Sequence, residues 1–129
     1  MRIYKTKVFS RWAAEQELND LSLWKAVSEM MSGLIDADLG SGLLKKRVAR
    51  TGQGKSGSFR TLVATNKGDL WIFIFGFSKN ERSNINQKEA KALKKLAEEL
   101  LSLNEQDLLK AQLNNELIQV NCNEEIKDS

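Results

Sequence analysis

Three ionisable residues in the middle of the chain have the types and spacing needed for phosphoryl chemistry. Arg60 lies within one apolar stretch, and Lys79 and Glu81 directly follow the next one. A carboxylate in such a place can act as a general base while neighbouring cations stabilise the charge that develops on a phosphorane. The 2′-OH of RNA then serves as the nucleophile, and much of the rate comes from its orientation. We therefore predict Arg60, Lys79 and Glu81 as the catalytic residues of RNA cleavage.

Arg60 and Glu81 each have a second interpretation. Arg60 shares a predicted strand face with the apolar residues Leu62 and Ala64, so it is either a phosphate ligand or the partner in a structural ion pair. Glu81 is either the base or a counter-ion that keeps the nearby cations, including Arg82, from repelling one another. The sequence leaves both pairs of alternatives open.

A basic segment surrounds these residues. Between Asp38 and Asp69 there is no acidic residue, whereas seven basic ones occur. Such a segment either attracts polyanions through phosphate neutralisation and counterion release, or forms a solvated face that keeps the protein soluble. On the first interpretation we expect RNA-binding residues at Lys45, Lys46, Arg47, Arg50, Lys55, Phe77 and Arg82.

Aromatic side chains alternate along the strand expected over residues 70–78. Regular alternation places Phe73, Phe75 and Phe77 on one face, together with Lys79. We expect Phe73 and Phe75 to be buried. Phe77, nearest the strand end, is expected to form an exposed platform on which an unpaired base stacks.

Two glycine-rich matches to nucleotide-binding motifs fail on their context. Gly52, Gly54 and Gly57 have the spacing of a dinucleotide fingerprint, but the next residues read as a strand and not as the required helix. Lys55 and Ser56, which come directly after Gly54, resemble the end of a Walker loop, but the first glycine of that motif is missing. The loop over residues 51–57 is therefore either a mobile basic loop that closes over a phosphate backbone or a plain flexible hairpin loop.

The surrounding elements predict an α+β fold. Two N-terminal helices pack on a twisted, mainly antiparallel sheet, and C-terminal helices follow it. The strand over residues 70–78 is apolar on both faces and should therefore lie centrally. The expected helices begin near residues 9, 20, 86 and 104, and the expected strands lie at 3–7, 43–50, 58–65, 70–78 and, as a strand or docked tail, 116–120.

The length and composition fit a single small domain. The chain has 129 residues, of which 41% are hydrophobic, and a net charge of +3. We expect one domain over residues 1–121, followed by a frayed acidic tail over 122–129 that either aids solubility or competes for the basic face. With one cysteine and no histidine, a Cys/His zinc site is excluded, and no apolar run is long enough for a membrane span. We predict a cytoplasmic protein without a metal, a cofactor or a membrane partner.

Two segments together resemble a known protein family. These are residues 54–61 (GKSGSFRT) and residues 75–85 (FGFSKNERSNI). They resemble the HigB-like branch of the RelE/ParE superfamily, the toxins of bacterial type II toxin–antitoxin pairs. The similarity runs over about residues 43–103 and is strongest over 54–85. It implies a RelE-like fold in agreement with the order of elements above.

The resemblance also implies an activity and partners. Such toxins enter the A site of the 30S subunit and cut the message by attack of the 2′-OH, and an antitoxin with a helix-turn-helix domain neutralises them. By position, Arg60 and Lys79 match the basic catalytic residues of these toxins, and Glu81 matches the acid of the Lys-Asn-Glu motif. Several relatives place a histidine or tyrosine near the C-terminus, whereas the only tyrosine here is Tyr4. The alternatives are a ParE-like toxin that inhibits DNA gyrase, and an inactive toxin kept as a partner for its antitoxin.

Overall fold

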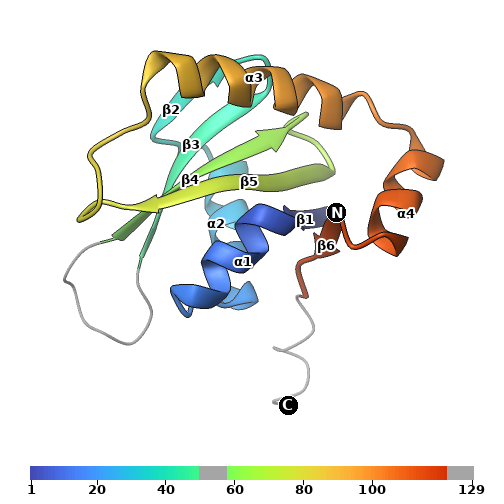
Figure 1. Cartoon of the computed structure of the whole chain (residues 1–129), viewed down its shortest axis with the longest axis horizontal. Helices are drawn as coiled ribbons and strands as arrows, with labels where there is room; N and C mark the ends of the chain where they lie inside the picture. Colours follow the sequence, from blue (N-terminus) through green and yellow to red (C-terminus); the bar gives the residue numbers. More distant parts are fainter. Residues whose placement is uncertain (50–57, 122–129) are drawn as a thin grey trace.

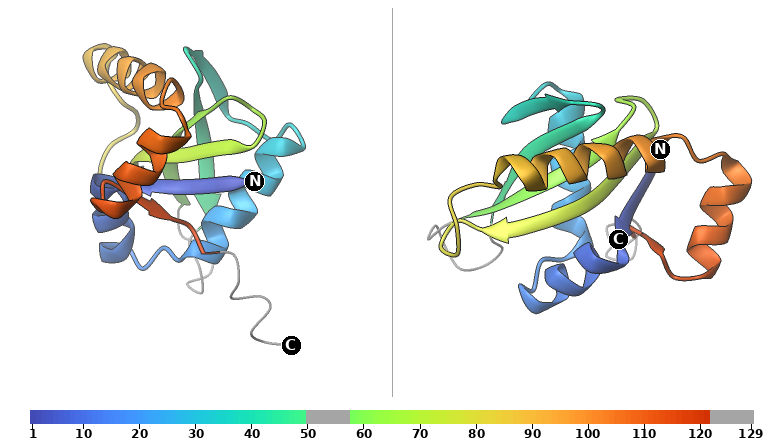
Figure 2. Two further views of the ribbon diagram at one scale, coloured as in Figure 1. Left: turned by 90° about the vertical axis from the view of Figure 1, so that its right-hand side faces the viewer. Right: turned by 45° about the horizontal axis from the view of Figure 1, so that its top comes forward.

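A six-stranded sheet forms the middle layer of the protein, and helices cover both of its faces (Figures 1 and 2). The computed structural model describes residues 1–49 and 58–121. The strands lie in the order β2-β3-β4-β5-β1-β6, and every pair of neighbours is antiparallel except β1 and β5, which are parallel. The strands are β1 (Arg2–Thr6), β2 (Ala37–Gly40), β3 (Leu43–Ala49), β4 (Ser58–Thr65), β5 (Leu70–Ser78) and β6 (Leu117–Gln119).

Each of the four described helices begins after a residue whose side-chain oxygen accepts a first-turn backbone N–H. This contact satisfies one of the donors that a helix start leaves without an intrahelical partner. The helix starts expected at Asn19 or Asp20, Asn86 and Asn104 are confirmed, and Asn86 forms a capping box with Glu89. The helices are α1 (Lys7–Glu15), α2 (Asp20–Met31), α3 (Gln87–Leu101) and α4 (Glu105–Leu113), with caps Thr6, Asn19, Asn86 and Asn104.

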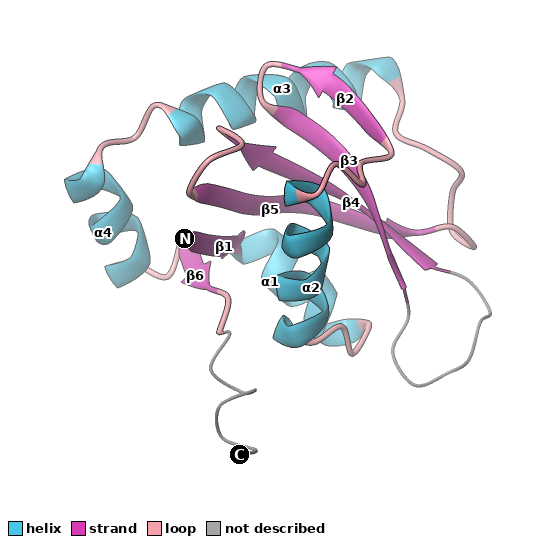
Figure 3. Ribbon diagram, turned by 180° about the vertical axis from the view of Figure 1, so that it is seen from behind, coloured by secondary structure: helices cyan, strands magenta, loops and turns pink. Residues whose placement is uncertain are grey.

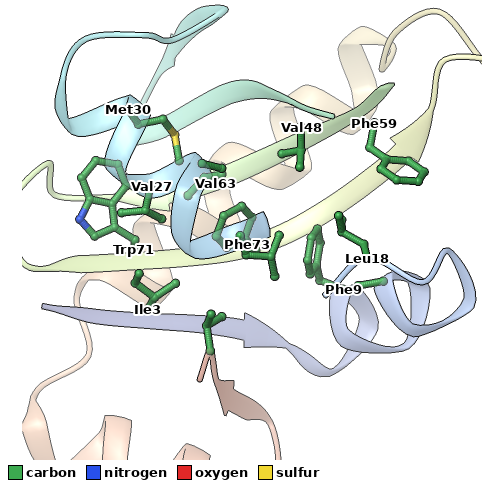
Figure 4. Close-up of a cluster of buried hydrophobic side chains, with 14 of the residues drawn as sticks. Ile3, Phe9, Leu18, Val27, Met30, Val48, Phe59, Val63, Trp71 and Phe73 are labelled. Atoms are coloured by element: carbon green, nitrogen blue, oxygen red, sulfur yellow. The ribbon is translucent and has the colours of Figure 1, made fainter. Parts of the chain in front are cut away.

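Helices α1 and α2 cover one face of the sheet. Seen from behind, α2 lies in front of the strands (Figure 3). Figure 4 shows the apolar core that forms beneath the two helices, in which Phe9 of α1 contacts Phe73 of β5 with ring centroids 5.3 Å apart. Both phenylalanines are fully buried, so truncating either one to alanine should cost about 3–5 kcal/mol.

Helix α3 covers the opposite face, and α4 packs beside β6. The apolar stripe of α3, which includes Leu93 and Leu96, packs against the core cluster to which Leu62 of β4 and Ile72 of β5 belong. Strand β5 is therefore buried on both faces, which confirms the prediction that it lies centrally. No helix in the described residues is both long and apolar enough to cross a membrane.

A β-bulge in β5 reverses the alternation of its aromatic side chains. Leu62 of β4 pairs with Phe75, but the next residue of β4 pairs with Phe73, so Ile74 is the extra residue. Phe73 therefore packs under α1 and α2, whereas Phe75 and Phe77 face α3. The prediction that these three phenylalanines share one face is wrong, because a bulge shifts the two-residue period by one.

Two further features of the sheet were not predicted. Residues 37–40, where no strand was predicted, form the edge strand β2. Strand β1 pairs in parallel with β5, although the two strands are far apart in sequence. The β1–β5 pairing joins segments that are distant in sequence, and the β2 segment has a weak strand propensity. Local sequence patterns therefore predict neither feature.

Candidate nucleic-acid interface

A row of side chains crosses three strands at the end of the sheet where β4 begins. Arg47 of β3 pairs directly with Arg60 of β4, and Arg60 pairs with Phe77 of β5. Because directly paired residues share a face, all three side chains lie on the side of the sheet that α3 covers. Two like charges opposite each other destabilise a sheet. The Arg47 Nε lies 3.7 Å from an Asp36 carboxylate oxygen, which offsets part of that cost. Arg60 has no carboxylate partner among the described residues, so Arg60 is the guanidinium of this row that is suited to a phosphate.

The neighbouring row continues the basic character. Lys45 of β3 pairs with Leu62, which pairs with Phe75. The Lys45 ammonium donates to the side-chain oxygen of Asn84 at 3.3 Å. Asn84 belongs to the segment that joins β5 to α3, so this hydrogen bond connects the joining segment to the sheet. Asn84 was not predicted as part of the site, because only the fold brings it beside β3.

The Arg60 guanidinium is half-buried and held by its own strand. Its Nη1 donates to Oγ of Ser58 at 2.7 Å, two residues earlier on the same face. Within residues 1–49 and 58–121, no carboxylate pairs with Arg60. The ion-pair interpretation of Arg60 therefore has no partner in the described part of the chain.

Lys79 and Glu81 lie in a tight turn directly after β5. Ser78, the last residue of β5, is the pairing partner of Phe59, so Lys79 emerges at the end of the sheet where Arg60 lies. The Glu81 carboxylate accepts the backbone N–H of Ser78 at 3.2 Å, and the Glu81 N–H donates to the Ser78 carbonyl at 3.0 Å. Glu81 thus fixes the turn that carries Lys79, and its side chain is exposed.

Arg82 is bound on three sides. Its guanidinium lies over the Phe77 ring, 5.6 Å from the ring centroid, and forms a two-bond pair with the Glu89 carboxylate. Its Nε donates to the backbone carbonyl of Asn84 at 3.1 Å. Phe77 is 3% exposed, so the prediction of an exposed stacking platform is wrong. The strand end that suggested exposure is covered by Arg82 and the joining segment.

The Arg82–Glu89 pair shifts the ionisation of both groups. Hydrogen bonding to the Arg82 guanidinium lowers the pKa of Glu89, the Asn86 N–H adds to this, and Glu89 in turn raises the pKa of Arg82. A lowered pKa means that the pair stabilises the fold at neutral pH, and that this contribution is lost as pH falls below the ordinary glutamate pKa of about 4.3.

We expect Glu89→Gln to lower the urea midpoint of unfolding at pH 7. The difference from the unsubstituted chain should shrink as the pH is lowered to 3, because protonation then removes the same charge from Glu89. Urea titrations from pH 7 to 3 measure this, with Glu98→Gln on the exposed side of α3 as the matched control. A difference that stays constant over the whole pH range contradicts the assignment of the pair.

Lys46 does not belong to the basic face. Its side chain points to the α2 side, where the ammonium pairs with Glu29 at 2.9 Å and donates to the Leu34 carbonyl at 3.0 Å. Lys46 is 5% exposed. The prediction that Lys46 contacts RNA is therefore wrong, since its neighbours Lys45 and Arg47 point to the opposite face.

The predicted RNA-binding residues Arg50 and Lys55, and the loop over 51–57, lie outside the described residues.

A groove of about 690 Å³ lies between α2 and β3 on that same α2 side. Apolar residues such as Ala26, Ile35 and Val48 line it together with the Lys46–Glu29 pair. Arg60, Lys79 and Phe77 do not line it, whereas Arg47 and Ser58 do. The candidate RNA site beside α3 therefore borders this groove at Arg47 and Ser58.

The fold and this face define a small α+β protein suited to binding a polyanion. A family model, the RelE toxin of the RelE / RelB toxin-antitoxin system, matches residues 1–120. The chain therefore belongs to the RelE toxin family. It is a toxin of a toxin–antitoxin system, and an antitoxin is the partner that membership implies. No curated protein matches the chain.

Proposed function

We propose that this toxin is an endoribonuclease of the HigB-like branch that cuts messenger RNA on the ribosome. The observation that supports it most is the Arg47–Arg60–Phe77 row, in which Arg47 and Arg60 leave adjacent strands on the same face and only Arg47 has a carboxylate partner, Asp36, among the described residues. Arginine binds phosphate through a planar fork of N–H donors. The exposed Lys79 at the same end of the sheet adds a third cation.

The proposed reaction uses the message's own 2′-OH as the nucleophile. Its oxygen loses its proton and bonds to phosphorus, and the bond from phosphorus to the 5′ oxygen breaks. The 5′ oxygen takes up a proton from solvent, so the products carry a cyclic phosphate and a 5′-OH. Arg60 and Lys79 stabilise the negative charge of the phosphorane, and this kind of stabilisation is often the largest catalytic contribution. Glu81 is the proposed base for the 2′-OH proton, since one carboxylate oxygen binds the Ser78 N–H and the other can accept a proton.

Cleavage in a purified translation system tests the proposal. Message ends are mapped by primer extension after incubation with the toxin, with and without ribosomes. We expect cuts in phase with codons that require ribosomes. Intact message at a toxin concentration equal to that of the ribosomes removes the proposal. Gyrase supercoiling measured on the same preparation then shows whether the toxin inhibits gyrase instead.

A further inference from the structure

We propose that three lysines on α3 form a second contact with the phosphodiester backbone of RNA, beyond the candidate site. These residues are Lys88, Lys91 and Lys95, named here the α3 lysine stripe. The choice of RNA as the ligand rests on the proposed function. The stripe itself rests on the position, exposure and charge of these side chains.

Helix geometry brings the three lysines together on the outer side of α3. Their spacing of three and four residues puts them on one side of an α-helix, over a length of about 10 Å. All three are exposed. The opposite side of α3 carries Leu93 and Leu96, which pack on the sheet. Within the described residues, no carboxylate pairs with any of the three.

The order of charges along α3 is unfavourable for the helix itself. A helix is stabilised by acidic residues near its N-terminus and basic residues near its C-terminus. In α3 the first-turn acid is Glu89, which is paired with Arg82, the lysines occupy the first two thirds, Glu98 and Glu99 lie at the end, and the last turn has no basic residue. Lys91 and Lys95 are also like charges four residues apart, which is destabilising. Helix stability therefore does not account for the stripe, whereas a polyanionic ligand does.

The stripe is continuous with the candidate site. The segment that joins β5 to α3 starts at Lys79 and reaches the first turn of α3 (Figure 1). The two acidic residues nearest to this joining segment already have partners, because Glu81 accepts the Ser78 N–H and Glu89 pairs with Arg82. Glu98 and Glu99 follow Lys95 by three and four residues, but neither forms an ion pair with it in the described structure. An RNA strand held at Lys79 can therefore extend along the outer side of α3.

Salt-dependent RNA binding tests the inference without any cleavage. The probes are a single-stranded RNA oligomer with 2′-O-methyl groups, which blocks the nucleophile, and small ribosomal subunits that carry no message. The full chain is compared with the triple variant Lys88→Gln, Lys91→Gln and Lys95→Gln. The matched control is Lys7→Gln, Arg11→Gln and Lys25→Gln, which removes three exposed charges from α1 and α2.

We expect the stripe variant to bind more weakly and to lose about 2 from the magnitude of the slope of log K against log salt, at about 0.7 per phosphate contact. Loss on the oligomer assigns the stripe to the message, and loss on the subunits assigns it to ribosomal RNA. A slope that is unchanged on both probes, or that falls equally in the control, overturns the inference.

Two further readouts separate this inference from other causes. The melting temperature of the stripe variant should not fall, because the substitutions remove unfavourable charges from the start of α3. A chain that binds RNA through the stripe but never cuts message keeps the inference and removes the proposed function. A chain that cuts message while the stripe variant binds RNA normally removes the inference alone.

Discussion

Replacing Arg60 by alanine is expected to reduce message cleavage about 100- to 1000-fold, the effect of removing one preorganised donor from a transition state. Arg60 lies between Arg47 and Phe77 on the α3 side of the sheet, and its guanidinium is oriented by Ser58. Alanine removes the donors without disturbing the strand. Primer extension at fixed toxin concentration measures the rate of cleavage.

Two controls define what this loss means. Arg60→Lys keeps the charge but not the fork of donors, so we expect it to recover only part of the activity. Arg11→Ala removes an exposed arginine from α1 on the other side of the sheet and should cut message at the normal rate. Equal activity of Arg60→Ala and the unsubstituted chain contradicts the catalytic assignment of Arg60.

Gly76→Ala is expected to destabilise the fold by about 3 kcal/mol, at the upper end of the cost of overpacking a core. An added Cβ at Gly76 lies 2.3 Å from the ring of Trp12. That ring cannot shift freely, because it packs against Phe9 and Phe59 with centroids 5.4 and 5.3 Å away. Urea unfolding of the two chains gives the difference in free energy of unfolding.

The same substitution tests the β-bulge in β5. If β5 had no bulge, residue 76 would face α3, and the methyl group added by Gly76→Ala would not contact Trp12. In a Trp12→Ala background we therefore expect Gly76→Ala to cost much less than it does alone, which is a non-additivity that a double-mutant cycle measures. Gly68→Ala, in the turn before β5, is the control and should change stability by less than about 1 kcal/mol. Additive costs contradict the packing of Trp12 on Gly76.

Much of the fold follows from local patterns. The caps Asn19, Asn86 and Asn104 mark three helix starts, and the apolar run of β5 indicates its central position. Local patterns do not predict the bulge at Ile74, because one extra residue does not change the pattern of a strand that is apolar on both faces. They also miss the edge strand β2, whose pairing with β3 is decided by the tertiary fold.

The candidate site was predicted less completely for the same reason. Residue types identified Arg60 and Lys79, but alternation alone could not decide which of Lys45 and Lys46 faces the sheet side that Arg60 shares. The buried pair with Glu29 decides it, because Lys46 is the residue that points to α2. Phe77 was misjudged because the cover supplied by Arg82 depends on Glu89, seven residues further along the chain.

Chemical shifts of the backbone amides during titration with uncleavable 2′-O-methyl message test the central claim most directly. The claim is that the α3-side face of β3, β4 and β5 binds the RNA phosphate. We expect the largest shifts at Arg47, Arg60 and the turn that carries Lys79, with little change at the α2 residues that line the groove, such as Ala26 and Glu29. Shifts confined to the α2 side, or none at millimolar RNA, contradict the claim.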